Sequence, residues 1–434
     1  MKKITFFLFG LIALVACEAE LETEKANSLG DGNRMTRSGL TISPEEAAAQ
    51  ALEFRNDIME QSGQTRGQKA EKGVTSVYAW RSSEIAPKSM TRSTASELLP
   101  DTLLYIVNFE DSCGYALVSA DALIPGVMAF VEEGSLSPNQ DINNPGFQNF
   151  LNGLGRFICD SIKAISDSLK YHTKDSTMFA KLDTTPQIAD NLSYTLYRTI
   201  FSNGPLLKTE WAQYGPYNSE CPLDSQGKRS VAGCVAIAIA QVAAYYRHPV
   251  SYNGHTYNWN AILRDSKVWP LDTIASHSVA QLINDIGGLV DMSYSSDVSL
   301  AYFDSIRHCL NVFGYHYLYN NTQWTDFSQI KEDISNGCPV IIRGNKNHQS
   351  NGHAWVIDGA VVKRHLFKQD KREYVHCNWG YGGECNGYFI YRAFNTMWDI
   401  ETDQMRNDYY GYLAQYYGYN NNNYAYHQIY PNNQ

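Results

Sequence analysis

The feature that most constrains the fold is an apolar segment that starts directly after Gly233 and Cys234 and runs to about His248. It is apolar nearly all round, so it predicts a helix buried in a core. Gly233 permits the turn that leads into this helix. Cys234 then lies where free N–H groups and the helix dipole favour the thiolate over the thiol. A cysteine on such a rigid platform is a candidate nucleophile, and a buried structural thiol is the alternative.

A thiolate nucleophile needs a base, and His353 has the most informative surroundings of the eleven histidines. Gly352 precedes it and an apolar strand from Ala354 follows. A cysteine that starts a helix, followed later by a histidine that starts a strand, is the arrangement of papain-type cysteine hydrolases. His348 and His376 lack such a context, and we expect them to be structural or surface residues.

Four segments carry a family resemblance. They are the upstream segment 211–218 (WAQYGPYN), then GCVAIAIAQ around Cys234, GHAWVIDG around His353, and residues 378–383 (NWGYGG). In this order and spacing they resemble the streptopain family of cysteine peptidases. Residues 103–109 (LLYIVNF), GYALVSAD and the helix after Pro145 are similar to the propeptide of that family. The resemblance covers essentially the whole chain after residue 40.

The resemblance implies an α+β, papain-like catalytic domain with a helical half and an antiparallel sheet half, preceded by a small α+β propeptide. It implies a cysteine endopeptidase zymogen that acts on proteins and peptides through a Cys-His dyad and an acyl-enzyme. It also implies that the propeptide is an intramolecular inhibitor until it is removed. A bulky hydrophobic side chain two positions before the scissile bond is the implied preference.

Three further site residues are candidates. Gln213 resembles the glutamine that donates to the oxyanion upstream of the nucleophile in papain, and a surface glutamine in a turn is the alternative. Papain-like enzymes orient the histidine with an asparagine two residues before a tryptophan, but here that position is Cys377 and Asn378 adjoins Trp379. Neighbours on a strand face opposite sides. The group that orients His353 therefore stays open between Trp379, Asn378 and a backbone carbonyl.

The N-terminus predicts export. Lys2 and Lys3 precede an apolar run that is too short for a permanent membrane span and ends in Leu-Val-Ala-Cys17. This resembles a lipobox, which predicts a signal peptide over residues 1–17 and acylation of Cys17; an ordinary signal peptide is the alternative. The glutamates that follow resemble surface-export signals of Bacteroidetes lipoproteins. We expect an exported protein, anchored by lipid to the outer membrane or cell surface, that maturation could release.

A chain of 434 residues is too long to fold around one ordinary hydrophobic core, so its length predicts two domains. A polar tether over 18–40 precedes an inhibitory propeptide with its linker over 41–194 and a papain-like domain over 195–434. The spacing of apolar residues and the positions of Gly, Pro and capping residues predict helices over 43–60, 144–169, 233–248, 279–287 and 326–336. They predict strands over 103–109, 115–119, 127–131, 339–343, 354–362, 373–379 and 387–392. The tail 409–426 is dense in Tyr and Asn, and the sequence does not decide whether it is a β segment followed by a disordered loop.

Composition excludes other classes. The formal net charge is −10 and no basic face is visible, so no nucleic-acid partner is expected. Eight cysteines remain after Cys17, none in a CxxC pair. We therefore expect no metal, no cofactor and mostly buried thiols. Another Cys-His amidase or acyltransferase, and a catalytically decayed lipoprotein that only binds, are the rival functions.

Overall fold

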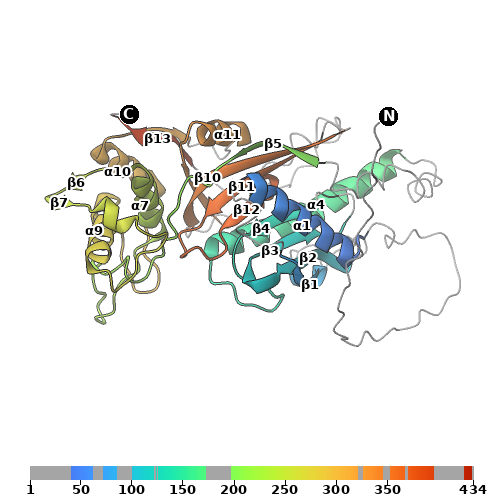
Figure 1. Ribbon diagram of the computed structural model, residues 1–434, viewed down its shortest axis with the longest axis horizontal. Helices are drawn as coiled ribbons and strands as arrows, with labels where there is room; N and C mark the ends of the chain where they lie inside the picture. Colours follow the sequence, from blue (N-terminus) through green and yellow to red (C-terminus); the bar gives the residue numbers. More distant parts are fainter. Residues whose placement is uncertain are drawn as a thin grey trace, which may run out of the picture. The chain divides into compact units, whose positions relative to one another are not determined.

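The computed structural model describes residues 41–61, 72–85, 100–121, 124, 126–172, 197–320, 326–345, 352–366, 370–394 and 425–432. Figure 1 labels most of their helices and strands. The α-helices are α1 (Pro44–Gln61), α2 (Ser82–Ile85), α4 (Pro145–His172), α7 (Cys234–Tyr246), α8 (Trp259–Ile262), α9 (Thr273–Leu289), α10 (Ile306–Phe313) and α11 (Phe327–Ser335). The strands are β1 (Val74–Arg81), β2 (Thr102–Phe109), β3 (Tyr115–Ser119), β4 (Val127–Val131), β5 (Tyr197–Asn203), β6 (Ser251–Tyr252), β7 (His255–Thr256), β8 (Tyr315–Asn320), β9 (Val340–Asn345), β10 (Gly352–His365), β11 (Lys371–Asn378), β12 (Gly387–Ile390) and β13 (Ala425–Pro431).

The first helix begins where its capping sequence predicts. The backbone N–H of Ser43 donates to Glu46 Oε2 at 2.7 Å, and the N–H of Glu46 donates to Ser43 Oγ at 3.2 Å. Pro44 occupies the first helical position, where its missing N–H costs nothing. This reciprocal capping box satisfies two N–H groups that the helix itself leaves free.

One antiparallel sheet runs through most of the described chain. Its strand order is β1-β2-β3-β4-β12-β11-β10-β9-β13-β8, and β5 pairs with β10 off this path. The meander expected for the N-terminal unit is formed by β2, β3 and β4, and β1 adds a further strand that the sequence did not predict. That unit does not keep a sheet of its own, because Ala129, Phe130 and Val131 of β4 pair with Phe389, Tyr388 and Gly387 of β12. Figure 1 shows this join in the middle of the sheet.

The join has a physical reason in β4. All five of its residues are apolar and buried, which suits an interior strand rather than the last strand of a small meander. The core beneath it is shared as well. Phe54 of α1 packs on Tyr374 of β11 with 4.9 Å between ring centroids, and Phe150 of α4 packs on Phe389 of β12 at 4.8 Å. The first half of the chain is thus bound to the second by a sheet ladder and by aromatic packing.

Four helices of the second half, α7 to α10, form a separate core around α7. Residues 235–244 of α7 are all buried, as their apolar character predicts. They pack in one hydrophobic cluster with α8, α9 and α10. Helices come first and most of the strands later, so the α+β class expected from the sequence is confirmed. None of the helices in the described part of the chain has the length and apolar character needed to cross a bilayer.

Four strands of the sheet were not expected at their positions. β1 and β5 are largely exposed or half-buried, so their apolar residues show little regular alternation. β8 was missed although it is rich in tyrosine, and β13 starts only at Ala425, near the end of the expected tail segment. The expected signal peptide, tether, most of the linker from Tyr171 to Tyr194, tail residues 409–424 and His348 lie outside the described residues.

Candidate active site

Cys234 is the first residue of α7. Gly233 precedes it with φ of 86°, in the region that favours glycine, and a Cβ there would lie 2.7 Å from Met292 Cε. The thiol is partly exposed, unlike the helix behind it. The backbone N–H of Ala354 donates to Cys234 Sγ at 3.4 Å, so the sulfur lies against the start of β10.

His353 is the second residue of β10 and is 3% exposed. Its Nε2 lies 2.9 Å from the backbone carbonyl oxygen of Trp379. Because a carbonyl can only accept, this contact places a hydrogen on Nε2 and leaves Nδ1 as the acceptor of the neutral ring. The rings of Trp355 and Tyr381 flank the imidazole, with centroids at 6.2 and 5.7 Å.

The two candidate residues interact electrostatically. Burial by itself raises the pKa of the Cys234 thiol, but the hydrogen bond and charge of His353 lower it, with help from the N–H groups of Ala354 and Val235. The net effect is a pKa below the ordinary value of a cysteine. A thiol with this environment can form a thiolate–imidazolium pair, which is the reactive form of a nucleophilic cysteine.

Trp379 is fully buried beside His353. Its indole Nε1 donates to the carbonyl of Cys385 at 2.8 Å, and its ring lies 5.2 Å from Trp355 and 5.2 Å from Phe389. The side chain is therefore a packing residue. Its backbone carbonyl, which has no side-chain signature in a sequence, is the group in contact with His353 Nε2.

Asn378 points away from His353. Its Nδ2 donates to the carbonyl of Thr209 at 2.6 Å, and its Oδ1 accepts from Gln241 Nε2 at 3.0 Å. Gln213 is held close to Cys234 by its backbone, because its carbonyl accepts from the N–H of Ala232 at 2.9 Å. Its side chain is almost buried. Of the three further candidates, Trp379 reaches His353 through its backbone, Gln213 lies in the neighbourhood of Cys234, and Asn378 does neither.

The first turn of α4 covers the imidazole. A Cβ on Gly146 would lie 2.3 Å from Trp379 Cε3 and 2.7 Å from His353 Cδ2, so the N-terminal half touches the candidate base directly. Asn144 caps this helix by accepting from the N–H of Phe147 at 3.1 Å. Its Nδ2 donates to the carbonyl of Glu384 at 3.0 Å, which ties the turn to the loop after Trp379. Only the Asn-Pro helix start was a signal for this contact in the sequence.

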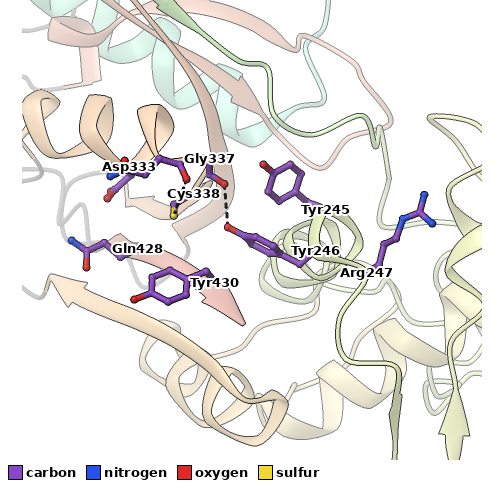
Figure 2. A pocket seen from close by; sticks show the side chains of 9 residues that line it. Tyr245, Tyr246, Arg247, Asp333, Gly337, Cys338, Gln428 and Tyr430 are labelled. Carbon is purple, nitrogen blue, oxygen red and sulfur yellow. Dashed lines mark hydrogen bonds between the residues drawn. The ribbon is translucent and has the colours of Figure 1, made fainter. Parts of the chain in front are cut away.

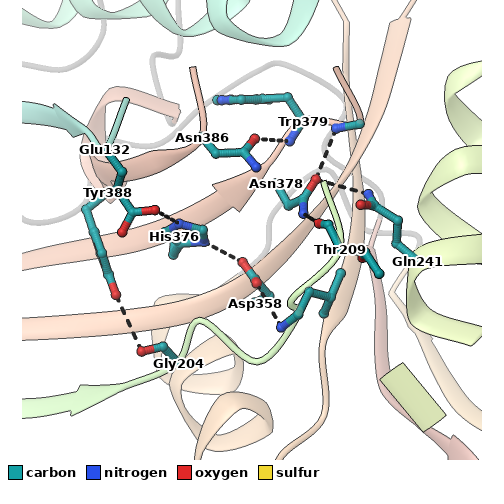
Figure 3. A network of polar contacts seen from close by, with 12 residues as sticks. Glu132, Gly204, Thr209, Gln241, Asp358, His376, Asn378, Trp379, Asn386 and Tyr388 are labelled. Carbon is teal, nitrogen blue, oxygen red and sulfur yellow. Dashed lines mark hydrogen bonds and ion pairs between the residues drawn. The ribbon is translucent and has the colours of Figure 1, made fainter. Parts of the chain in front are cut away.

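Two ion pairs join the halves of the chain. Asp57 of α1 bonds to Lys363 of β10, whose side chain is 1% exposed. Glu132, next to β4, lies 3.3 Å from His376 Nε2, and Asp358 lies 2.6 Å from His376 Nδ1 (Figure 3). The expectation of a structural His376 fits this arrangement, but its two carboxylate partners, buried Asp358 and half-buried Glu132, were not foreseen because they come from distant segments.

A pocket of about 800 Å³ lies elsewhere (Figure 2). Tyr245, Tyr246 and Arg247 line it at the C-terminal end of α7, together with Asn336–Cys338 and residues of β13. Each residue of a helix rises about 1.5 Å, so the 13 residues of α7 separate this pocket from Cys234 by roughly 18 Å. The pocket is therefore not the site of Cys234 chemistry.

The other cysteines do not build a second centre. Apart from Cys234, seven cysteines follow residue 100; all are free thiols and five are buried, in line with the expected role as small apolar residues. Within the described ranges no group of three or more His, Cys, Asp or Glu side chains is placed to hold a metal ion.

Comparisons with known proteins assign the two halves of the chain. Residues 211–389 match the peptidase C10 family, and residues 40–158 match the Spi protease inhibitor family. Together these spans cover more than half of the chain. The first contains Cys234, His353 and Trp379, and the second contains the turn of α4 that lies on His353 and Trp379.

Two curated relatives agree with this, and one solved structure was also matched. The chain is 25% identical to streptopain of Streptococcus pyogenes over 338 residues, which is 67% of this chain and 74% of streptopain. It is 24% identical to the thiol protease/hemagglutinin PrtT of Porphyromonas gingivalis over 371 residues, 78% of this chain and 40% of PrtT. A mutant prointerpain A fragment of Prevotella intermedia is 23% identical with a TM-score of 0.48, covering 69% of this chain and 92% of that structure. The chain is a streptopain-like cysteine protease zymogen, with a peptidase C10 (streptopain family) domain matched over residues 211–389 and an N-terminal inhibitor domain matched over residues 40–158.

Proposed function

We propose that Cys234 is the nucleophile and His353 the general base of this peptidase. The observation that carries the proposal is the placement of the Cys234 thiol at the start of the buried helix α7, against the strand that begins with His353. The Trp379 carbonyl holds Nε2–H of His353, so Nδ1 is the nitrogen free to exchange a proton with the thiol. This arrangement supports the carbonyl as the group that orients the base.

The reaction runs through an acyl-enzyme. The Cys234 thiolate attacks the peptide carbonyl carbon, and a C–S bond forms as the carbonyl becomes a tetrahedral oxyanion. The imidazolium of His353 gives its proton to the leaving amine as the C–N bond breaks. A water molecule then gives a proton to His353 and attacks the thioester, which releases the acid and restores the thiol. We assign Gln213 as a donor to the oxyanion, because its backbone bond to Ala232 holds it close to Cys234.

Substitution of the nucleophile tests this assignment. The variant Cys234→Ala should lose all peptide hydrolysis while it keeps the melting temperature of the precursor. Cys338→Ala is the matched control, since Cys338 is a buried thiol at the far pocket. It should keep the activity of the wild type. Hydrolysis by the Cys234→Ala variant would refute the assignment. If the protein is instead an amidase or acyltransferase, its activity should depend on the thiol but it should cleave no protein substrate.

We propose that the N-terminal domain inhibits by covering His353 and Trp379 with the first turn of α4. The β4–β12 ladder and the Asp57–Lys363 and Glu132–His376 pairs hold that turn in place. Cleavage between residues 180 and 200, by the enzyme itself or by a second peptidase, then frees the catalytic domain. Exposed polar segments are where proteolytic nicking concentrates.

Incubation of purified precursors tests the maturation step. The wild type should shorten to a fragment that begins within residues 180–200, and the Cys234→Ala precursor should stay at full length when incubated alone. N-terminal sequencing reads both results. An uncut precursor that is as active as the fragment would contradict the inhibitory role.

We propose export and lipid attachment through Cys17. The apolar run that ends at this cysteine supports the proposal. Because Cys17 and the peptidase lie on opposite sides of the cleavage region, maturation would release the peptidase from the membrane. Cys17→Ala should move the precursor from the membrane fraction to the soluble fraction, and mass spectrometry of the membrane form should find an acylated Cys17. An unmodified Cys17 in that form would refute the anchor.

A further inference from the structure

Gln241 is a polar residue inside the apolar helix that carries Cys234. It is 0% exposed, and the other residues from Val235 to Ala244 are apolar. It follows Cys234 by seven residues, about two helical turns, so both side chains lie on the same side of α7. A buried amide costs free energy unless all its polar atoms are bonded. Its bonds therefore indicate what it does.

Gln241 is paired with Asn378, the last residue of β11 (Figure 3). Gln241 Nε2 donates to Asn378 Oδ1 at 3.0 Å, and Gln241 Oε1 accepts from the N–H of Trp211 at 3.2 Å. Asn378 Oδ1 also accepts from the N–H of Gly380 at 3.2 Å, and its Nδ2 donates to the carbonyl of Thr209 at 2.6 Å. The backbone groups at both ends permit only one orientation of each amide.

The bond to Gly380 bears directly on the base. The carbonyl of Trp379 and the N–H of Gly380 belong to one planar trans peptide, in which they point in opposite directions. The carbonyl meets His353 Nε2, and the N–H on the other side meets Asn378 Oδ1. Gly380 has φ of 71°, and glycine leaves this peptide easy to rotate. Asn378 therefore holds the peptide plane whose carbonyl holds the imidazole.

The bond to Trp211 extends the connection to the third part of the site. Trp211 lies two residues before Gln213, and its carbonyl accepts from the N–H of Gly382 at 2.9 Å. The amide pair thus joins three segments that come from distant parts of the chain. These are the helix of Cys234, the segment of Gln213 and the turn that holds His353.

We propose that Gln241 and Asn378 are positioning residues, which act on His353 through the Trp379–Gly380 peptide and keep the segment of Gln213 in register with Cys234. This inference rests on the catalytic roles proposed above for Cys234 and His353. Asn378 contacts neither residue. It serves the function of the papain asparagine indirectly, with a backbone carbonyl in between.

Two substitutions of Gln241 should behave differently with pH. Gln241→Leu fits the apolar helix but removes both bonds, so kcat should fall about 10- to 100-fold with KM for a short peptide nearly unchanged, as expected for a misplaced catalytic group. Gln241→Glu places a buried carboxyl there, and burial raises the pKa of such a group. While protonated it can accept from Trp211 and donate to Asn378 Oδ1, as the glutamine does. Activity should therefore be close to wild type at acid pH and should fall towards that of Gln241→Leu as the carboxyl ionises.

The experiment uses full-length chains matured with a trace of affinity-tagged wild-type enzyme, which is then removed. Hydrolysis of a short peptide and the rate of Cys234 alkylation by iodoacetamide are measured from pH 4 to 9, and the alkylated residue is identified by peptide mapping. Tyr257→Phe is the control, because it removes the buried hydrogen bond to Asp285 Oδ2 at 2.7 Å away from the site. It should lower stability without moving either profile.

The outcomes separate the two levels of inference. Wild-type enzyme whose reactive thiol is not Cys234 would refute the proposed function itself. A reactive Cys234 in the wild type, with profiles in Gln241→Leu and Gln241→Glu equal to the wild type, would overturn the positioning role alone. If Gln241→Leu fails to fold, Gln241→Glu still tests the positioning role. If Gln241 were only structural, folded Gln241→Glu enzyme would show no loss of activity at alkaline pH beyond that of the wild type.

Discussion

Gly146 makes the inhibitory contact sensitive to a single methyl group. In the variant Gly146→Ala, the new Cβ would lie 2.3 Å from Trp379 Cε3 and 2.7 Å from His353 Cδ2, and neither ring is free to move in its aromatic surroundings. Overpacking of this kind costs about 1–3 kcal/mol. Replacing a helical glycine by alanine returns about 0.5–1 kcal/mol. At the midpoints of these two ranges the docked state should therefore weaken by about 1.25 kcal/mol, or roughly 8-fold in the equilibrium between covered and uncovered site.

Two assays measure this change. In the Cys234→Ala background, where no processing occurs, Gly146→Ala should lower the urea midpoint of the precursor. With Cys234 intact, each precursor is purified with a reversible thiol blocker and then activated with reductant. The Gly146→Ala precursor should then show a shorter lag before peptide hydrolysis than the wild type. Asn152→Ala is the control, because Asn152 is an exposed residue of the same helix. A Gly146→Ala precursor with the stability and lag of the wild type would refute the covering role of α4.

Two predictions concern the ion pairs between the halves of the chain. Asp57→Asn removes the carboxylate that is bonded to the buried ammonium of Lys363 and should destabilise the Cys234→Ala precursor by about 2–4 kcal/mol in urea unfolding. Adding Lys363→Met to the same chain should recover most of this loss. If Asp57→Asn costs as much in the Lys363→Met chain as it does with Lys363 present, the pairing is contradicted. Although burial favours the neutral imidazole, Asp358 and Glu132 raise the pKa of His376 to about 10. Because this pKa lies above its unfolded value of about 6.5, the stabilisation is complete below pH 6.5 and is lost as pH rises towards 10. In Glu132→Gln the folded pKa of His376 should be lower, so the pH-dependent loss of stability in melting curves should be smaller and complete at a lower pH. An unchanged pH dependence would count against the pair.

The helix that begins at Cys234 and the start of β10 could be predicted because their signals are local. A glycine, a cysteine and a long apolar run identify α7 without knowledge of what packs on it. The same holds for the capping box at Ser43 and for the strands on either side of the turn at Asp111.

Partners from distant segments could not be predicted. The group that contacts His353 Nε2 is a backbone carbonyl, which every residue has, so no residue type marks it. The pairing of β4 with β12 depends on strands more than 250 residues apart, although the unbroken apolar run of β4 indicates an interior strand. Gln241 did carry a usable signal, since a single amide in an otherwise apolar buried helix needs polar partners.

Site-resolved labelling of the thiols tests the central claim most directly. A peptide-based, thiol-reactive irreversible inhibitor is added to the uncut precursor and to the matured enzyme, and every modified cysteine is identified by peptide mapping. We expect one label, on Cys234, in the matured enzyme, and little or none on the uncut precursor, because α4 covers His353 beside it. A label on a different cysteine, or equal labelling of Cys234 before and after the N-terminal domain is removed, would contradict the assignment of nucleophile and inhibitor.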